Sequence, residues 1–173
     1  MTKTLKLKDN PITAAKPEDI PQIAAMAIKA MMDAETPLKP CFEKIMVTVT
    51  NKVLQDVCFV RRNKLDPRKI DGFLLLGHQI PDYSLDQVLS GLLFYTKPEF
   101  RSFKLAKSLL NAAKKYAIIE GSPLVFDLFT QRDVQQKKKL LKYLGFQEVG
   151  SFYFFVPPAR INDREEEVCQ AVQ

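Results

Sequence analysis

The first two helices predicted from the apolar pattern lie in the N-terminal third of the chain. Residues 20–31 place Ile, Ala and Met at intervals of three and four, which lets a helix bury one face. Asp19 and Gln22 have the spacing of a capping box, so we expect this helix to begin at Asp19. Residues 42–54 favour a second helix, although a run of β-branched residues in the middle lowers the helix propensity.

Two further helices are predicted in the C-terminal half, and a glycine follows each. Residues 102–120 carry one apolar stripe with most of their lysines outside it, and Gly121 is placed to end the helix. Asp133 and Gln136 have capping-box spacing at the start of a last helix, which Gly145 closes. Each predicted helix therefore has one face suited to a core.

Short apolar runs bounded by turn residues predict β-strands between these helices. The strands are expected at residues 11–15, 57–61, 70–80, 87–96, 123–130 and 150–156. The three middle strands follow one another closely, which predicts an antiparallel meander. Residues 123–130 are almost continuously apolar, so we expect a central strand covered on both faces. The element order predicts one α/β or α+β domain with a mixed sheet and a right-handed βαβ unit.

Composition agrees with one globular domain. The chain has 173 residues, of which 46% are hydrophobic and 27% charged. No segment reaches the roughly 18–20 consecutive apolar residues that a membrane span needs. The Lys-rich start lacks the apolar stretch of a signal peptide. We expect a polar arm at residues 1–10, a domain at 11–156 and a charged tail at 157–173, without membrane contact.

The cysteines argue against a metal site and against a disulfide framework. Cys41, Cys58 and Cys169 form no CxxC pair, and His78 is the single histidine, so no usual zinc site can be assembled. An odd, sparse set of cysteines is typical of a reducing compartment, which predicts a cytoplasmic protein. A lone histidine such as His78 is more often structural than catalytic.

A net charge of +6 favours anionic partners. Lys137, Lys138, Lys139 and Lys142, together with the pair at 61–62, could contact phosphate groups. No aromatic residues interleave with them to stack on bases. We therefore interpret the lysines as a solvated helix face, and nucleic-acid binding is disfavoured.

Residues 95–110 are the most informative segment, because a strand passes through a short turn directly into a helix. The segment reads Tyr-Thr-Lys-Pro-Glu-Phe-Arg-Ser-Phe-Lys-Leu-Ala-Lys-Ser-Leu-Leu. A helix N-terminus offers unpaired N–H groups and the positive end of the helix dipole, and Arg101 and Lys104 add charge there. The segment can therefore hold a pyrophosphate, with an ordinary basic strand-to-helix turn as the alternative.

This segment resembles the acyl-CoA motif of the GNAT superfamily of N-acetyltransferases. In that motif a strand runs into P-x-x-R, then Q/R-x-x-G-x-G/A, and then a helix. The match consists of Pro98, Arg101, Ala106, Leu109 and Leu110. Residues 12–32 are similar to the family's first strand and helix, and residues 133–146, which end in Leu-Gly-Phe, to its last helix. The resemblance spans roughly residues 11–156 and implies a mostly antiparallel sheet with helices on both faces.

The resemblance also implies acetyl-CoA as co-substrate, bound in a V-shaped gap between two neighbouring strands. The pantetheine arm would pair with backbone groups near Phe94, Tyr95 and Thr96. The pyrophosphate would bind the amides of Arg101, Ser102, Phe103, Lys104, Leu105 and Ala106. The second partner would be an amine acceptor that the sequence does not name.

Two positions depart from the family pattern. Lys104 stands where the family has the central glycine of the turn. A side chain there could keep the backbone from the phosphates, or its ammonium could reach them. Leu141 stands where many members have the tyrosine that protonates the leaving thiolate. Tyr143 is two residues further on, about 200° around the helix, and so does not replace it directly.

Three residues are candidates for proton transfer. Tyr95 and Tyr153 are phenols that could reach the gap in place of the missing tyrosine. Asp127 lies in the apolar strand beside the expected gap, where burial would raise the pKa of a general base. A hydrogen-bonded or solvated carboxylate at the strand end is the alternative for Asp127.

Two functions therefore stay open. The first is an acetyl-CoA-dependent N-acetyltransferase in which a primary amine attacks the thioester directly, with no covalent enzyme intermediate. The second is a GNAT-fold protein that has lost catalysis and serves as a structural or interaction component of a larger assembly. A cofactor cleft filled by Lys104 and Phe103 would favour the second. A basic nucleic-acid-associated module is a weaker third alternative.

Overall fold

The computed structural model of the chain describes residues 12–34, 39–55, 57–81, 85–127 and 133–148. The predicted N-terminal arm, the C-terminal tail and the last strand at residues 150–156 lie outside the described residues, so they stay predictions. Within the predicted domain, the other gaps fall between helices and strands.

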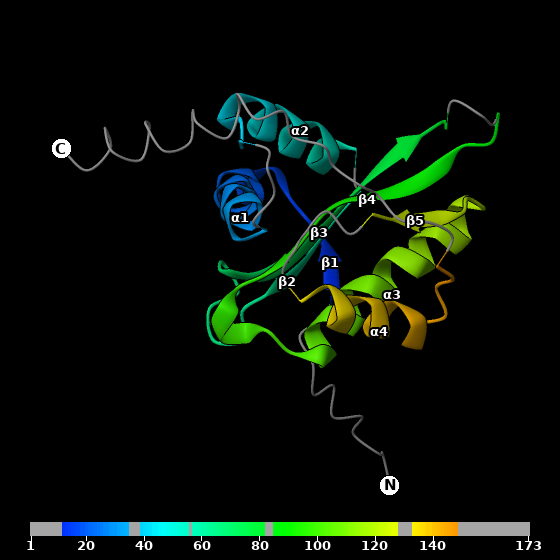
Figure 1. Cartoon of the computed structure of the whole chain (residues 1–173). Coiled ribbons are helices and arrows are strands. Elements are labelled where there is room, and N and C mark those ends of the chain that lie inside the picture. Colours follow the sequence, from blue (N-terminus) through cyan, green and yellow to red (C-terminus); the bar gives the residue numbers. More distant parts are fainter. Residues whose placement is uncertain (1–11, 35–38, 56, 82–84, 128–132, 149–173) are drawn as a thin grey trace, which may run out of the picture.

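A five-stranded mixed sheet forms the centre of the described structure (Figure 1). The strands are β1 (Ile12–Ala14), β2 (Cys58–Arg62), β3 (Ile70–Gln79), β4 (Val88–Thr96) and β5 (Leu124–Phe126). They lie side by side in chain order. Strands β1 to β4 pair antiparallel, whereas β5 runs parallel to β4. The predicted meander, the parallel βαβ pairing and the fold class are confirmed.

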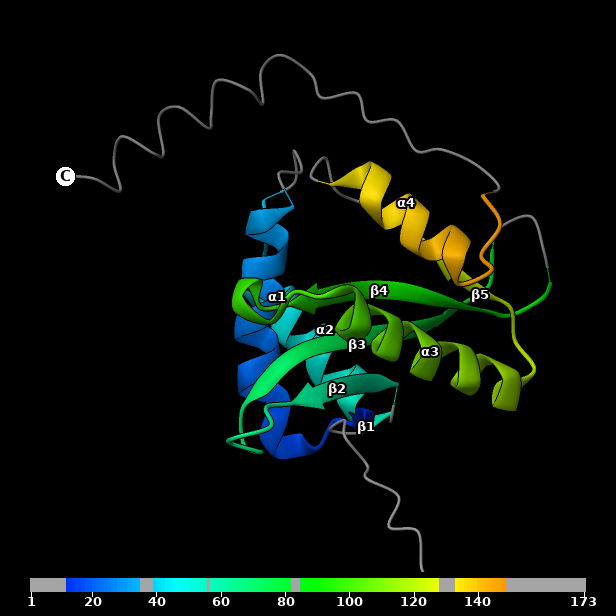
Figure 2. The same ribbon diagram turned by 90° about the horizontal axis from the view of Figure 1, so that it is seen from below.

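Helices cover the sheet on both faces (Figures 1 and 2). The α-helices are α1 (Ile20–Asp33), α2 (Phe42–Leu54), α3 (Phe103–Glu120) and α4 (Val134–Tyr143). Helices α1 and α2 pack on one face, and α3 and α4 on the other. Two 3₁₀ turns, η1 (Pro17–Asp19) and η2 (Pro98–Phe100), lead into α1 and α3.

Strand β3 belongs to both cores because its side chains alternate between the two faces. Phe73 and Leu75 join the core with α1 and α2, while Leu74 and Leu76 join the core with α3 and α4. All four are fully buried. Each contributes roughly 1.5–3 kcal/mol to folding, and a strand buried on both faces has no polar alternation.

Asp19 does not cap α1 as predicted. Its carboxylate accepts the Lys16 N–H at 2.8 Å and two guanidinium bonds from Arg62 at 2.9 and 2.7 Å. Burial alone would raise the pKa of Asp19, but the bonds from Arg62 and Lys16 outweigh it and hold that pKa below its usual value. The carboxylate closes η1 and ties it to β2, because the half-buried Arg62 cation competes better for it than the helix amides do.

The starts and ends of the later helices follow the sequence more closely. Gly121 and Gly145 have φ angles of 65° and 84°, and they end α3 and α4 as predicted. Asp133 occupies the N-cap of α4, but its side chain makes no capping hydrogen bond, so the predicted capping box is wrong. The backbone of Asp133 has φ 55°, in the left-handed region, which is not the extended conformation that a capping side chain needs.

The described part of β5 is more exposed than the apolar run predicted, and residues 128–130 of that run lie outside the described residues. Strand β5 pairs with β4 only over Leu124–Phe126, and the side chain of Val125 is 38% exposed. Leu124 and Phe126 pack toward α3 and α4, so Val125 faces the other way. There α1 contacts β3 and β4, and α2 contacts β3. The predicted cover on both faces is therefore wrong for the described part of β5.

Candidate functional site

Strand β4 loses its neighbour on one side halfway along its length. Its pairing with β5 ends at Gly91 and Phe126, and its pairing with β3 skips Leu92 at the same level. Such a β-bulge bends a strand and increases its twist. Beyond it, β4 continues to Thr96 with no described partner on the β5 side. Among the described residues, the sheet therefore opens at Leu92.

Gly91 allows the two strands to meet at the opening. A Cβ atom on Gly91 would lie 2.1 Å from the ring carbon Cε1 of Phe126, far inside contact distance. The ring of Phe126 packs edge-on against Phe146, with centroids 5.6 Å apart. A side chain at Gly91 would have to displace the Phe126 ring, so the glycine allows the two strands to pair closely up to this level.

The backbone of β4 turns alternate residues toward this opening. The Lys97 N–H donates to the Asp71 carbonyl of β3 at 2.9 Å, so Tyr95, two residues earlier, also faces β3 with its backbone. Phe94 and Thr96 therefore direct their N–H and C=O groups toward the β5 side. Of the three residues expected near the pantetheine arm, these two present backbone groups to the opening.

The N-terminus of α3 follows directly at the end of β4. The Oγ of Ser102 accepts the Leu105 N–H at 3.2 Å, and the Ser102 carbonyl accepts the Ala106 N–H at 3.1 Å. The Arg101 N–H donates to the Pro98 carbonyl at 3.2 Å. Three of the amides expected to hold a pyrophosphate are thus already bonded within the chain.

Lys104 and Phe103 are both exposed at the start of α3. The side chain of Lys104 is exposed, and its carbonyl accepts the Ser108 hydroxyl at 2.8 Å within α3. Phe103 is 53% exposed and packs edge-on against Tyr143 at 5.2 Å between ring centroids. Side chains that filled a cofactor cleft would be buried, so the exposure of these two does not favour a closed, non-catalytic cleft.

The side chain of Arg101 contacts the end of α1 and the end of β4. Its Nε donates to the Thr96 carbonyl at 3.2 Å, and its Nη2 lies 3.3 Å from Oδ2 of Asp33. The Tyr95 hydroxyl donates to the same carboxylate oxygen at 3.3 Å, and the guanidinium lies 5.7 Å from the centroid of the Tyr95 ring. The sequence does not predict Asp33 as part of this site, because only the fold brings the end of α1 to the end of β4.

The environment of Tyr95 keeps its phenol protonated. Burial first, and then the charge of Asp33 and the hydrogen bond to it, raise the pKa of Tyr95 above its usual value despite nearby Arg101. Its proton is directed at Asp33, so Tyr95 is poorly placed to protonate a thiolate in this arrangement. Tyr153, the other predicted phenol, lies outside the described residues.

Tyr143 and Leu141 differ in environment as their rotation around α4 predicts. Leu141 packs against the core under α3, whereas Tyr143 is 64% exposed at the outer junction of α3 and α4. There Lys107 Nζ lies 3.4 Å from the Tyr143 hydroxyl and 5.1 Å from the ring centroid. No described tyrosine takes the place that Leu141 leaves.

Asp127 follows the last residue of β5 and is half-buried. The register pairs Gly91 with Phe126, so the next step along both strands places Asp127 at the level of Leu92, where the sheet opens. The predicted carboxylate and the bulge therefore lie at the same level. His78 is exposed on β3 and pairs in register with Leu89, before the opening.

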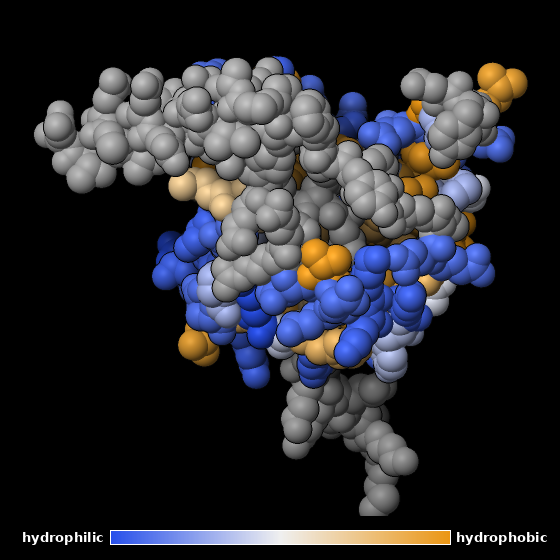
Figure 3. Space-filling view, viewed as in Figure 1, coloured by the Kyte–Doolittle hydropathy of each residue, from blue (hydrophilic) through white to orange (hydrophobic). Residues whose placement is uncertain are grey.

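The lysines of α4 form ion pairs on a hydrophilic surface (Figure 3). Lys138 and Lys142 both pair with Glu148, the latter at 3.1 Å. Hydrogen bonds from these lysines lower the pKa of Glu148. This pairing supports the interpretation of a solvated helix face and reduces the charge offered to a nucleic acid.

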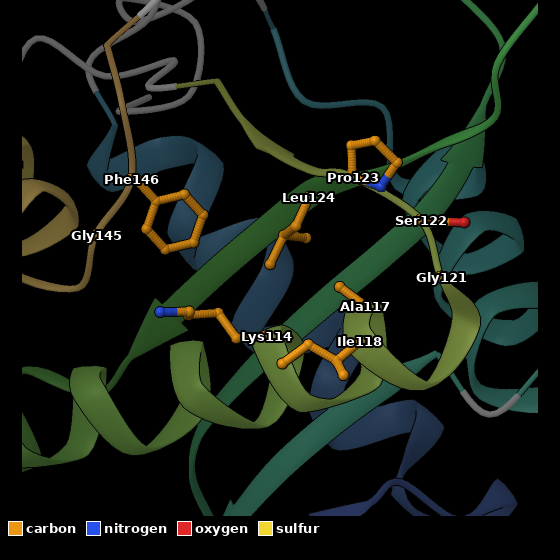
Figure 4. Close-up of a pocket in the computed structure, with 9 residues that line it drawn as sticks. All are labelled: Lys114, Ala117, Ile118, Gly121, Ser122, Pro123, Leu124, Gly145 and Phe146. Carbon is orange, nitrogen blue, oxygen red and sulfur yellow. The ribbon is translucent and has the colours of Figure 1, made fainter.

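A hollow of about 490 Å³ lies at the opposite end of α3 (Figure 4). Its lining consists of Lys114, Ala117, Ile118, Gly121, Ser122, Pro123, Leu124, Gly145 and Phe146. Lys114 donates to the Leu144 carbonyl at 2.6 Å and lies 5.9 Å from the centroid of Phe146. Because the charge of Lys114 is engaged there and the helix end is the negative one, this hollow does not suit an anionic cofactor.

Comparison with known proteins gives a likeness in structure but not in sequence. No family model and no curated protein sequence matches the chain. A probable acetyltransferase has 20% sequence identity and a TM-score of 0.65, over 85% of this chain and 96% of that chain. The aminoglycoside N-acetyltransferase AAC(6′)-Iy, in complex with a bisubstrate analogue of CoA, has 16% sequence identity and a TM-score of 0.64. This match covers 84% of this chain and 96% of that chain.

A predicted acetyltransferase from Clostridium acetobutylicum, solved with acetyl-CoA, has 14% identity and a TM-score of 0.63, over 84% of this chain and 94% of that chain. The chain has the GNAT fold. These GNAT-fold proteins are matched over nearly their whole length.

In this GNAT fold, the candidate site consists of the opening beside β4 and the start of α3. No group of three metal-ligating side chains occurs among the described residues. No described helix is long and apolar enough to cross a membrane.

Proposed function

We propose that the chain is an acetyl-CoA-dependent N-acetyltransferase that transfers the acetyl group directly to a primary amine. The observation that carries the proposal is the separation of β4 from β5 at Leu92, with the N-terminus of α3 at the far end of the same strand. A long ligand with an anionic end and an extended arm fits such an arrangement. The GNAT-fold neighbours solved with CoA compounds support it.

The residues proposed to hold the cofactor follow from the directions of the β4 backbone groups and from the position of the α3 N-terminus. Backbone groups of Phe94 and Thr96 would pair with the amide-containing arm. Ser102 and Phe103 amides at the positive end of α3, with the side chain of Lys104, would face the phosphates. The lysine then compensates with charge for the closer backbone approach that a glycine would allow.

Asp127 is the proposed base, because the register places it at the opening beside Leu92. The acceptor nitrogen gives a proton to this carboxylate, its lone pair forms a bond to the carbonyl carbon, and the carbon–sulfur bond breaks. Strand N–H groups near the bulge would polarise the carbonyl oxygen. As the amide forms, its nitrogen loses a second proton, which the CoA thiolate takes up, and no covalent enzyme intermediate forms.

Thermal unfolding with millimolar acetyl-CoA tests the proposal. Ligand at ~100 times its dissociation constant adds about 2.7 kcal/mol to the free energy of unfolding. For a domain of this size that raises Tm by roughly 5–10 °C. Thiol release with a panel of primary amines then measures turnover. Asp127→Asn should keep the Tm shift and lose most turnover, which separates binding from catalysis.

A second function is kept because specific positions favour it. Leu141 replaces the expected acid, and the amides of Arg101, Leu105 and Ala106 are bonded internally. These positions fit a non-catalytic component of a larger assembly. If Tm does not move with acetyl-CoA or CoA, this second function replaces the first.

A further inference from the structure

We propose that Asp33 is a positioning residue that holds Arg101 in place for an anionic ligand at the end of β4. This inference rests on the proposed function, because the anion in question is the phosphate part of CoA. Asp33 is the last residue of α1, so it links the helix nearest the N-terminus to the turn before α3.

The contact network that carries the inference starts in the core. Tyr95 is only 6% exposed, and its hydroxyl donates to Oδ2 of Asp33 at 3.3 Å. A buried phenol has little rotational freedom, so it holds the carboxylate in one place. That same oxygen accepts from Nη2 of Arg101 at 3.3 Å. The buried Tyr95 therefore restricts the position of Asp33, and Asp33 in turn restricts the position of the Arg101 guanidinium near the surface.

The guanidinium keeps part of its hydrogen-bonding capacity. Its Nε donates to the Thr96 carbonyl at 3.2 Å, its Nη2 meets Asp33, and Tyr95 lies under its plane. No described residue accepts a hydrogen bond from Nη1, and the Arg101 side chain is 37% exposed. A guanidinium has five N–H donors in a rigid plane, so its outer edge stays available to a phosphate.

The opposite possibility is that Asp33 competes with the ligand for Arg101. Asp33 accepts from Nη2 of the guanidinium and the Thr96 carbonyl accepts from Nε, which leaves the Nη1 donors for a ligand. The carboxylate therefore orients the cation more than it blocks it. Positioning predicts weaker ligand binding without Asp33, and competition predicts tighter binding, so the sign of the change decides.

The test measures CoA binding by calorimetry in Asp33→Ala, in Arg101→Met and in the double variant. Asp33→Ala should weaken binding roughly three- to tenfold, as expected for coupled neighbours, and should have almost no effect when Arg101 is already Met. Asp33→Asn, whose amide oxygen still accepts, should fall in between. Glu99→Ala is the matched control, because it removes an exposed carboxylate two residues from Arg101 that makes no described contact with it.

Two outcomes would overturn the inference: tighter binding in Asp33→Ala, or an equal loss with Met at position 101. A second readout is the Arg101 Nε–H signal in the ¹H–¹⁵N spectrum, which should move in Asp33→Ala and stay in Glu99→Ala. If wild type does not bind CoA, the proposed function fails. An unmoved Nε–H signal then overturns the positioning as well, whereas a moved signal keeps it as a contact that holds Arg101.

Discussion

At the scale of single residues, the described structure relies on charged side chains that meet across long sequence distances. Asp19 and Arg62 are the most buried such pair, with the carboxylate 4% and the arginine side chain 20% exposed. Asp33 and Arg101 are a second, more exposed pair. The first pair joins η1 to β2. The second pair joins the end of α1 to the turn that follows β4.

Removing the cation of the buried pair should cost stability in a pH-dependent way. Arg62→Met leaves the Asp19 carboxylate buried without its partner, which we expect to lower the free energy of unfolding by roughly 2–4 kcal/mol at pH 7. The folded-state pKa of Asp19 is below its ordinary value, so wild type holds this stabilisation above that ordinary value. It loses the stabilisation as the pH falls through the folded pKa.

The stability difference between wild type and Arg62→Met should therefore shrink on acidification below about pH 4, the ordinary range of an aspartate. Urea unfolding at a series of pH values measures it. Arg68→Met is a control, since Arg68 pairs with Asp66 on the exposed surface. A difference that stays constant down to pH 3 would show that Asp19 does not depend on Arg62.

At the scale of elements, the start of α3 serves both stability and the candidate site. Ser102 caps the helix through the Leu105 amide, and the same first turn would face the phosphates. Helix capping and anion binding use the same kind of group, the unpaired N–H of the first turn. Changes at Ser102 can therefore separate the two roles.

Two substitutions at Ser102 should have different effects. Ser102→Ala removes the cap and should lower the free energy of unfolding by about 1 kcal/mol. Ser102→Asp keeps an accepting oxygen and suits the helix dipole, so stability should be retained. Its negative charge should weaken CoA binding severalfold by repulsion. Unfolding curves and calorimetry check the pair, and CoA binding unchanged in Ser102→Asp would place the phosphates elsewhere.

At the scale of the whole molecule, the fold could be predicted from the sequence because each element has its own apolar period. The described strands begin within one residue of the expected positions, and α2 has the expected bounds. The site could be predicted only in part. The turn into α3 is contiguous in sequence, so its residues were found together.

The other parts of the site depend on strand register and on tertiary contacts. The bulge at Leu92 and the approach of Phe126 to Gly91 exist only once β4 has both neighbours. Asp33 meets Arg101 across 68 positions of sequence. The predicted capping of α1 by Asp19 is wrong for the same reason, because Arg62, 43 positions away, binds the Asp19 carboxylate. Local patterns cannot show such competition.

The order of strands in the sheet has a consequence for the sequence of folding events. Strands β1 to β4 follow the chain order, and the hairpin β2–β3 has the shortest connection. Strand β5 must return past the whole of α3 before it can pair with β4, and such closures carry a larger entropic cost. The β4–β5 pairing should therefore form late and open first.

Native-state hydrogen exchange would show this as two classes of protected amide. The Leu89 N–H, bonded to the Pro123 carbonyl, should exchange through a smaller opening than the Leu76 N–H, bonded to the Val57 carbonyl inside the meander. Equal protection would mean that the sheet opens as one unit. If Leu89 exchanges faster, the strand that bounds the candidate site can separate while the meander stays folded, which gives a long ligand a route between β4 and β5.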